Sequence, residues 1–146
     1  MKLSVITVVR NCADTIAETL GTVAEQSHRD LEHIVIDGAS TDATLEIVAR
    51  HAGPSVRIVS EPDHGIYDAM NKGVRLSTGQ VIGFLNADDV YAHPRVIADV
   101  VAAMQRDDVD AVFGDAGFFR ADRPSQPVRR YNSARFSPKR IAWGWM

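Results

Sequence analysis

Four short apolar runs, each followed by a helix pattern, most constrain the fold of this chain. The runs cover residues 3–9, 31–36, 56–59 and 81–85 and are rich in Val and Ile. Runs of this length, bounded by turn residues, predict strands buried on both faces, as in a parallel sheet covered by helices. The alternation therefore predicts an α/β fold, a three-layer sandwich around a mainly parallel sheet, with 81–85 as a central strand.

Apolar residues at helical spacing predict a helix after each run. The first helix is expected to begin at Thr15, with Glu18 completing a capping box. The second and the fourth helix are each expected to bury one apolar side against the sheet. These two sides consist of Leu45, Val48, Ala49 and Ala52, and of Val96, Ile97, Val100, Val101 and Met104. A fifth strand is expected at 110–113.

Composition limits the function classes. The 146 residues carry a net charge of −3, which argues against general affinity for nucleic acid. Cys12 is the single cysteine, so we expect no disulfide framework and a reducing, cytoplasmic location. The apolar run 3–9 is too short for a signal peptide, and no stretch reaches the length of a membrane span.

The end of the chain differs from the rest in charge. Seven of the 16 Lys and Arg residues follow residue 119, against one acidic residue, Asp122. We therefore divide the chain into 1–119 and a basic, Trp-containing segment, 120–146. This segment is expected to face phosphate or an anionic membrane at the inner face of the cell membrane; the alternative is a solvated tail. Its apolar end, 141–146, could instead pair with a second copy in a homodimer.

Polar residues follow each predicted strand. They are Arg10 and Asn11, Asp37, Glu61 and Asp63, Asn86 with Asp88 and Asp89, and Asp115. The carboxyl ends of parallel strands share one edge of the sheet, where open α/β sheets bind ligands. We therefore expect these side chains to meet at one rim.

Asp88 and Asp89 are the candidates for a metal site. Two carboxylates at a strand end suit Mg²⁺ or Mn²⁺ bridging to substrate phosphates. The alternative is a solvated turn or helix cap, because Asn-Ala-Asp-Asp is also good turn chemistry. The first turn has no glycine-rich pattern, and no G-x-S-x-G is present, which argues against dinucleotide binding, P-loop hydrolysis and a serine nucleophile.

Four ordered blocks, residues 4–11, 33–42, 60–73 and 84–89, resemble family 2 glycosyltransferases. They are most similar to the WcaA-like branch, which builds bacterial extracellular polysaccharide and lipopolysaccharide. The resemblance implies a GT-A fold, a Rossmann-like nucleotide-binding sandwich. It also implies inverting, metal-assisted transfer of a sugar from a nucleotide-diphosphate donor, a UDP-sugar, to a glycan or lipid-linked acceptor.

The resemblance also implies roles for individual residues. The residues expected to line the nucleotide are Thr7, Arg10 and Asn11, with Asp37 bonded to the base. Those expected along the ribose and phosphates are Asp63, Gly65, Asn71 and Lys72. An ion pair on the helix surface is the alternative role for Lys72. Asn86-Ala87-Asp88 occupies the place of the DxD metal motif, with Asn86 where many members carry Asp. Asp88 would hold the metal, and Asp89 would assist.

The catalytic base is the part least visible in the sequence. In the family it is a carboxylate on the acceptor side, downstream of a segment like 143–146, so we expect the acceptor half to be truncated here. Asp115 is the remaining candidate on the rim. Two hypotheses stay open: a transferase, or a non-catalytic module that binds a nucleotide sugar. A receiver-type phospho-acceptor domain would need an acidic pair after the first strand, where this chain has Arg10 and Asn11.

Overall fold

The computed structural model describes residues 1–120 and 126–135. Its contacts divide the chain into two compact units, residues 1–107 and 108–146. This division falls before the boundary expected between 119 and 120, because the strand expected at 110–113 does not form.

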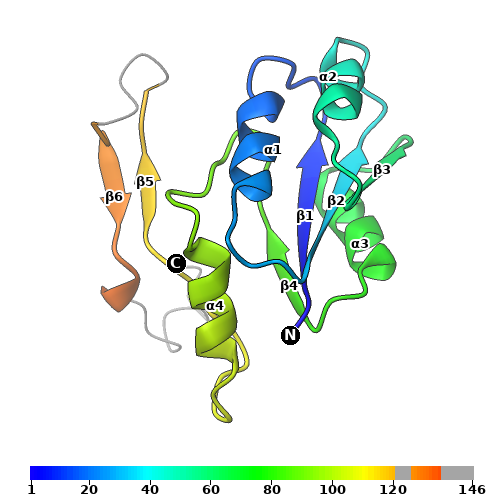
Figure 1. The fold of residues 1–146 in the computed structure, drawn as a ribbon. Helices are drawn as coiled ribbons and strands as arrows, with labels where there is room; N and C mark the ends of the chain where they lie inside the picture. Colours follow the sequence, from blue (N-terminus) through cyan, green and yellow to red (C-terminus); the bar gives the residue numbers. More distant parts are fainter. Residues whose placement is uncertain (121–125, 136–146) are drawn as a thin grey trace. The chain divides into compact units, whose positions relative to one another are not determined.

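The first unit contains a parallel four-stranded sheet with the strand order β3-β2-β1-β4 (Figure 1). The strands are β1 (Leu3–Val9), β2 (Leu31–Asp37), β3 (Val56–Ser60) and β4 (Val81–Phe84). The predicted parallel sheet is thus confirmed, with strand ends within one residue of those expected. The expectation of a central strand at 81–85 is wrong, because β4 pairs with β1 alone among the described strands and forms an edge of the sheet.

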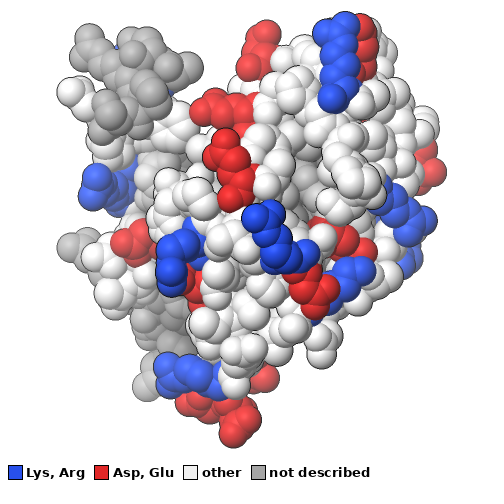
Figure 2. All heavy atoms as spheres, viewed as in Figure 1, with Lys and Arg blue, Asp and Glu red and all other residues white. Residues whose placement is uncertain are grey.

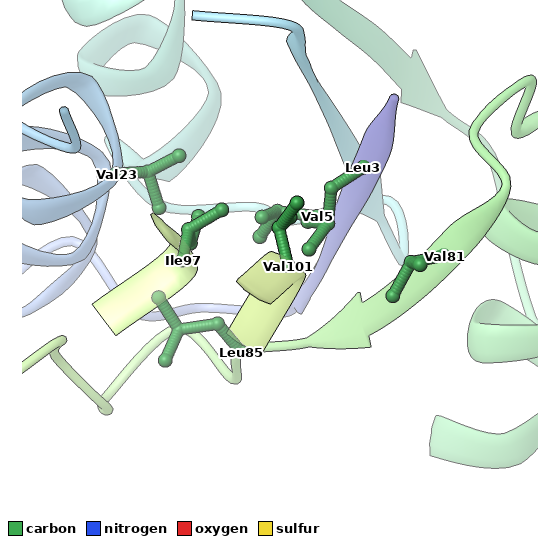
Figure 3. Packing of buried hydrophobic residues seen from close by; sticks show 7 residues of the cluster. All are labelled: Leu3, Val5, Val23, Val81, Leu85, Ile97 and Val101. Carbon is green, nitrogen blue, oxygen red and sulfur yellow. The ribbon is translucent and has the colours of Figure 1, made fainter. Parts of the chain in front are cut away.

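Helices cover both faces of this sheet, which confirms the three-layer sandwich. They are α1 (Ile16–Ala24), α2 (Thr44–His51), α3 (Ile66–Leu76) and α4 (Val96–Met104). Side chains of α1, α2 and α4 pack on one face, and α3 packs on the other face over β1 and β2. Figure 3 shows the cluster in which α1 and α4 meet β1 and β4.

Alternation along β4 leaves part of the sheet uncovered. Val81 and Leu85 point into the cluster with α1 and α4. Ile82 and Phe84 therefore point to the opposite face, since successive side chains of a strand alternate. They are 38% and 48% exposed, because α3 covers β1 and β2 instead.

Two details of the helices differ from expectation. Thr15 precedes α1, but its side chain makes no capping hydrogen bond; the Cys12 carbonyl accepts bonds from the first amides instead. The capping-box prediction is therefore wrong. In α2 the buried residues are Thr44 and Val48, whereas the expected inward residues Leu45 and Ala49 are exposed. The Thr44 hydroxyl accepts a bond from Cys12 N (2.8 Å), which turns that side of the helix inward. The inward residues expected for α4 are confirmed as buried or partly buried.

The second unit contains an antiparallel pair, β5 (Ala116–Phe118) and β6 (Arg129–Tyr131), followed by a 3₁₀ turn, Ser133–Arg135. The Phe118 and Tyr131 rings meet edge to face at 5.6 Å, and the Arg129 guanidinium lies 4.5 Å from the Tyr131 ring centre. Within the basic segment, residues 121–125 and 136–146 lie outside the described residues, and they include Arg123, Lys139, Arg140, Trp143 and Trp145. Among the helices of the described part, none combines the length and apolar character needed to cross a bilayer.

Close packing of α3 on β1 depends on Gly73. A Cβ at Gly73 would lie 2.4 Å from the Ile6 Cγ2 atom, inside the core. Gly73→Ala is therefore expected to lower the free energy of unfolding by about 1–3 kcal/mol through overpacking, although alanine is the better helix former. Urea denaturation measures the change.

The matched control is Gly21 in α1, where a Cβ would meet nothing within 4 Å. Gly21→Ala is expected to raise the free energy of unfolding by about 0.5–1 kcal/mol, the ordinary helix effect. Equal stabilisation by both substitutions would show that α3 does not pack this closely.

Candidate functional site

The carboxyl ends of the four parallel strands lie at one edge of the sheet, toward which the arrowheads of Figure 1 point. The register pairs Val9 with Asp37 and Asp37 with Ser60, and Leu85 N donates to the Ile6 carbonyl (3.0 Å). The loops that follow the strands therefore meet at one rim, as expected from the sequence. These loops begin at Arg10, Gly38, Glu61 and Leu85.

Asp37 lies beneath this rim rather than on it. Its side chain is fully buried, and its carboxylate accepts bonds from Ser40 N (3.1 Å), Ser40 Oγ (2.5 Å) and Ser60 Oγ (2.6 Å). Both oxygens of Asp37 are occupied and shielded in this structure, and its expected contact with the base stays a prediction. Asp37 joins the loop after β2 to the end of β3.

Asn11 joins the loops after β1 and β2. Asn11 N donates to Ser40 Oγ (2.9 Å), and Asn11 Oδ1 accepts from Thr41 N (2.8 Å). Asn11 and Ala39 both have positive φ angles, 52° and 54°. Such angles are costly for a non-glycine residue and persist where surrounding contacts over-determine them. Asn11 was expected to line the nucleotide; its side-chain oxygen is committed to this loop.

Thr7 is a second predicted site residue whose side chain does not lie on the rim. It is fully buried within β1, and its Oγ1 lies 2.9 Å from Nε2 of buried His33. Burial also lowers the pKa of His33 to about 4. The Thr7 side chain thus faces the interior of the sandwich, and its expected contact with a nucleotide stays a prediction.

Asp63 and Arg10 lie together over Gly38. A Cβ at Gly38 would lie 2.3 Å from Asp63 Oδ2 and 3.5 Å from Arg10 Cδ, so the absence of a side chain admits both. Asp63 Oδ1 accepts a bond from Gly65 N (2.9 Å), and Gly65 has a φ of +112° that favours glycine. The structure thus brings these predicted residues together at the rim.

Lys72 braces the same loop from α3. Its Nζ donates to the Pro62 carbonyl (2.7 Å) and pairs with Glu61 (3.0 Å) and Asp68 (3.7 Å). The Glu61 carboxylate raises the pKa of Lys72, which keeps the ammonium charged. The ion-pair alternative is confirmed, and Lys72 is less free to contact phosphate than expected. Asn71, its neighbour on α3, is exposed.

The loop after β4 presents an unsatisfied oxygen and two neighbouring carboxylates. Asn86 Nδ2 donates to Asp89 Oδ2 (3.2 Å), while Asn86 Oδ1 is buried without a hydrogen-bond partner among the described residues. Burial, and then the charge of exposed Asp88, raises the pKa of the Asp89 carboxyl. A cation would relieve both costs, because it would coordinate the free oxygen and neutralise the two carboxylates.

This donor set fits Mg²⁺ or Mn²⁺ shared with a substrate. In the described part of the chain, no three His, Cys, Asp or Glu side chains converge on one point. Mg²⁺ is commonly held by one or two carboxylates together with substrate phosphates and water. Asp88, Asp89 and the Asn86 oxygen match that pattern.

Thr19 supports the loop after β4 and is a residue that sequence reasoning missed. This buried hydroxyl on α1 lies 3.0 Å from the Ala87 carbonyl and 2.9 Å from the Asp89 carbonyl. Thr22 likewise accepts a bond from Tyr91 N (3.2 Å). The available signal was a threonine on the apolar side of a helix, where a hydroxyl needs a partner.

Asp115 belongs to the second unit, and the fifth strand that was expected to carry it to the rim is absent from the described residues. Its Oδ1 accepts bonds from Ser133 N and Ser133 Oγ, both 2.7 Å. These bonds, with the charge of Arg130, lower the pKa of the Asp115 carboxyl. The expectation that Asp115 follows a fifth parallel strand is therefore wrong.

The model of glycosyl transferase family 2 matches residues 4–143 of the chain. The chain belongs to glycosyltransferase family 2. A "PGL/p-HBAD biosynthesis glycosyltransferase" of Mycobacterium bovis is 38% identical over 116 residues, covering 77% of this chain and 45% of the relative. An uncharacterized glycosyltransferase of Mycobacterium tuberculosis is 40% identical over 103 residues, covering 70% and 39%. The family 2 chain thus spans less than half the length of these curated relatives.

Solved structures share its GT-A fold. A mannosyltransferase from Pyrobaculum calidifontis, in complex with GDP-Man and Mn²⁺, matches with a TM-score of 0.71 and 28% identity. The match covers 84% of this chain and 36% of the mannosyltransferase chain. S. aureus TarS 1–349, in complex with UDP-GlcNAc, has a TM-score of 0.65 and 27% identity, covering 70% and 30%. The GT-A expectation is confirmed.

Titration of His33 should be visible in the stability of the first unit. Its pKa of about 4 lies below the ordinary 6.5, so the unfolded chain binds this proton at a higher pH than the folded chain. The contribution of neutral His33 to the free energy of unfolding is therefore fully present above pH 6.5. It is lost as pH falls toward 4, by about 3 kcal/mol in all. Urea unfolding across this range measures the loss, and His33→Gln should flatten it.

The neighbouring carboxyl of Glu32 sets the lower limit of that measurement. Burial acts to raise its pKa, but hydrogen bonds from Ser4, Thr78 and Lys2 prevail and lower it from 4.5 to about 2. Its own contribution is therefore lost only as pH falls below 4.5. A His33→Gln profile as steep as the wild-type profile between pH 6.5 and 4.5 would contradict the assignment to His33.

Proposed function

We propose that this chain is the donor-binding part of a glycosyltransferase that moves a sugar from a nucleotide-diphosphate donor, a UDP-sugar, to a glycan or lipid-linked acceptor. The observation that carries the proposal is the loop after β4. There the Asn86 oxygen has no hydrogen-bond partner among the described residues, and the Asp88 charge raises the pKa of the neighbouring Asp89 carboxyl. A divalent cation would satisfy the oxygen and offset the repulsion between the carboxylates. Relatives that bind GDP-Man with Mn²⁺ and UDP-GlcNAc support the same assignment.

The charges around the rim support a metal-assisted reaction. On the face drawn in Figure 2, several acidic side chains lie near one another in the upper middle of the view. Arg10 is exposed and forms no ion pair with any described residue, so it can contact a donor phosphate. Mg²⁺ or Mn²⁺ held by Asp88, with Asp89 and Asn86 assisting, would stabilise the departing diphosphate. Gly65 and Asn71 would lie along the ribose and phosphates.

The proposed transfer is an inverting displacement, in which a carboxylate takes the proton of the acceptor hydroxyl. Asp115 is the candidate base in the described part of the chain. Its lowered pKa makes it a weak base, and one of its oxygens already accepts two bonds from Ser133. This observation favours a second candidate function, a module that binds a nucleotide sugar without transferring it.

The donor site predicts metal-dependent nucleotide binding. In calorimetric titrations, removal of Mn²⁺ with a chelator should weaken UDP binding at least about 10-fold, and Asp88→Asn should do the same in the presence of Mn²⁺. Glu25→Gln is the matched control, because Glu25 is exposed at the C-terminal end of α1, outside the loops that form the rim. UDP affinity that is unaffected by both changes would contradict the metal site.

The same samples separate the two candidate functions. A transferase should also release UDP slowly from a UDP-sugar in water and faster with an acceptor, whereas a binding module should bind without release. Loss of a general base commonly lowers the rate by a factor of ~10²–10⁴, so the assay must detect rates that are lower by this factor. Asp115→Asn should lower the rate by such a factor only if Asp115 is the base.

The second unit is proposed to contact an anionic membrane that carries the acceptor. Arg129 lies over the exposed ring of Tyr131, which meets the ring of Phe118, and Arg130 is exposed on the same strand. This combination of cations and aromatic rings suits a lipid interface. The full chain should sediment with phosphatidylserine vesicles at low salt, and Arg129→Gln with Arg130→Gln should reduce the bound fraction. Equal sedimentation with neutral vesicles would contradict the charge-based contact.

A further inference from the structure

A pocket lies at the edge of the sheet opposite to the rim. Residues from the last turns of α1 and α2 and from the first residues of β2 and β3 line it, at the end away from the arrowheads of Figure 1. Its volume is about 140 Å³, which is comparable to that of an engineered cavity that holds benzene. Because β2 is seven residues long, the two edges lie roughly 20 Å apart, and the pocket is separate from the donor site.

The pocket combines apolar and basic side chains. Leu20 and Val23 from α1 and Leu31 from β2 supply apolar surface. Arg29 and His51 also line the pocket, and none of its described lining residues is acidic. A ligand that matches both kinds of surface carries a negative charge on an apolar body.

His33 contributes a buried polar group to this lining. The side chain is only 3% exposed, and its Nε2 lies 2.9 Å from Thr7 Oγ1. Burial lowers the pKa of His33 to about 4, so the ring is neutral at neutral pH. When the Thr7 hydroxyl donates to Nε2, the ring carries its proton on Nδ1, which has no hydrogen-bond partner among the described residues. Nδ1 can then donate to a molecule in the pocket.

Arg29 supplies the positive charge. It is exposed and forms no ion pair with any described residue. The carboxylate of Asp30, next to it in the sequence, pairs instead with the amino group of Met1 (3.7 Å). The guanidinium is therefore available to an anion from solution, to which it can donate two parallel hydrogen bonds.

Carbonyl groups at the ends of α1 and α2 would oppose an anion if they were free, because the C-terminal end of a helix is electronegative. In α1, the Thr22 carbonyl accepts a bond from Gln26 Nε2 (3.1 Å), and the Val23 carbonyl accepts from Gln26 N (3.2 Å). In α2, the Ile47 carbonyl accepts from His51 Nδ1 (2.9 Å). These oxygens are thus satisfied within the protein, whereas Arg29 is not.

We propose that this pocket is a second binding site, which takes a small organic anion: a carboxylate on an apolar body about the size of a benzene ring. Arg29 pairs with the carboxylate, and His33 donates to one of its oxygens. The apolar body removes water from Leu20, Val23 and Leu31. This inference does not depend on nucleotide binding at the rim.

The test uses three probes on the isotope-labelled full chain: benzoate, neutral benzamide and inorganic phosphate. In NMR titrations, benzoate should shift the amide signals of residues 28–33 and 51–56 with a Kd of about 1 mM or lower. Benzamide has the same ring without the charge, and phosphate has the charge without the ring. Each should bind at least ~10-fold more weakly, as expected when a charge-assisted hydrogen bond or the burial of a ring is lost.

A pair of arginine variants completes the test. Arg29→Gln should weaken benzoate binding at least ~10-fold and bring the ratio of benzoate to benzamide affinity toward about one. Arg57→Gln is the matched control and should change neither value. Arg57 is exposed, forms no ion pair with a described residue, and follows Val56 of the pocket lining, so it faces the other side of β3.

Three results would overturn the inference. The first is the absence of benzoate shifts at residues 28–33 and 51–56. The second is binding of benzamide or phosphate as tight as that of benzoate, which would show that the pocket does not recognise a charge on an apolar body. The third is benzoate binding that Arg29→Gln leaves unchanged or that Arg57→Gln weakens equally.

Discussion

The buried carboxylate of Asp37 is the interaction on which the rest of the rim depends. A carboxylate withdrawn from water is costly unless its oxygens accept hydrogen bonds, and this one accepts three from Ser40 and Ser60. Meeting that requirement draws the loop after β2 onto the end of β3. Asn11 then attaches the loop after β1 to the same segment, through Ser40 and Thr41. Three loops are thereby held by a few polar side chains at the end of an apolar sheet.

The loop after β4 is fixed in a different way. Here the support comes from α1, where buried Thr19 contacts two carbonyl groups and Thr22 accepts an amide. The carboxylates of Asp88 and Asp89 are consequently held near each other although they repel. In the metal-assisted transfer that we propose, this arrangement would hold a divalent cation against an anionic donor.

The sheet and the rim could be predicted because their signals are local. Apolar runs such as 3–9 and 31–36 have the length and composition of buried strands, and parallel pairing places every carboxyl end at one edge. Burial within the rim could not be predicted, because it depends on register and loop path. Thr7 faces His33 inside the sandwich, and Lys72 forms an ion pair with Glu61. Neither contact follows from the order of residues in the sequence.

The position of β4 has a practical consequence. Its four residues carry no charge and no proline, the features by which natural sheets discourage pairing at an edge. Ile82 and Phe84 add an apolar surface to the same strand. Among the described strands, β4 therefore offers a template for intermolecular strand addition. The solubility of the protein, more than its folding, would then set the concentration at which the nucleotide site can be studied.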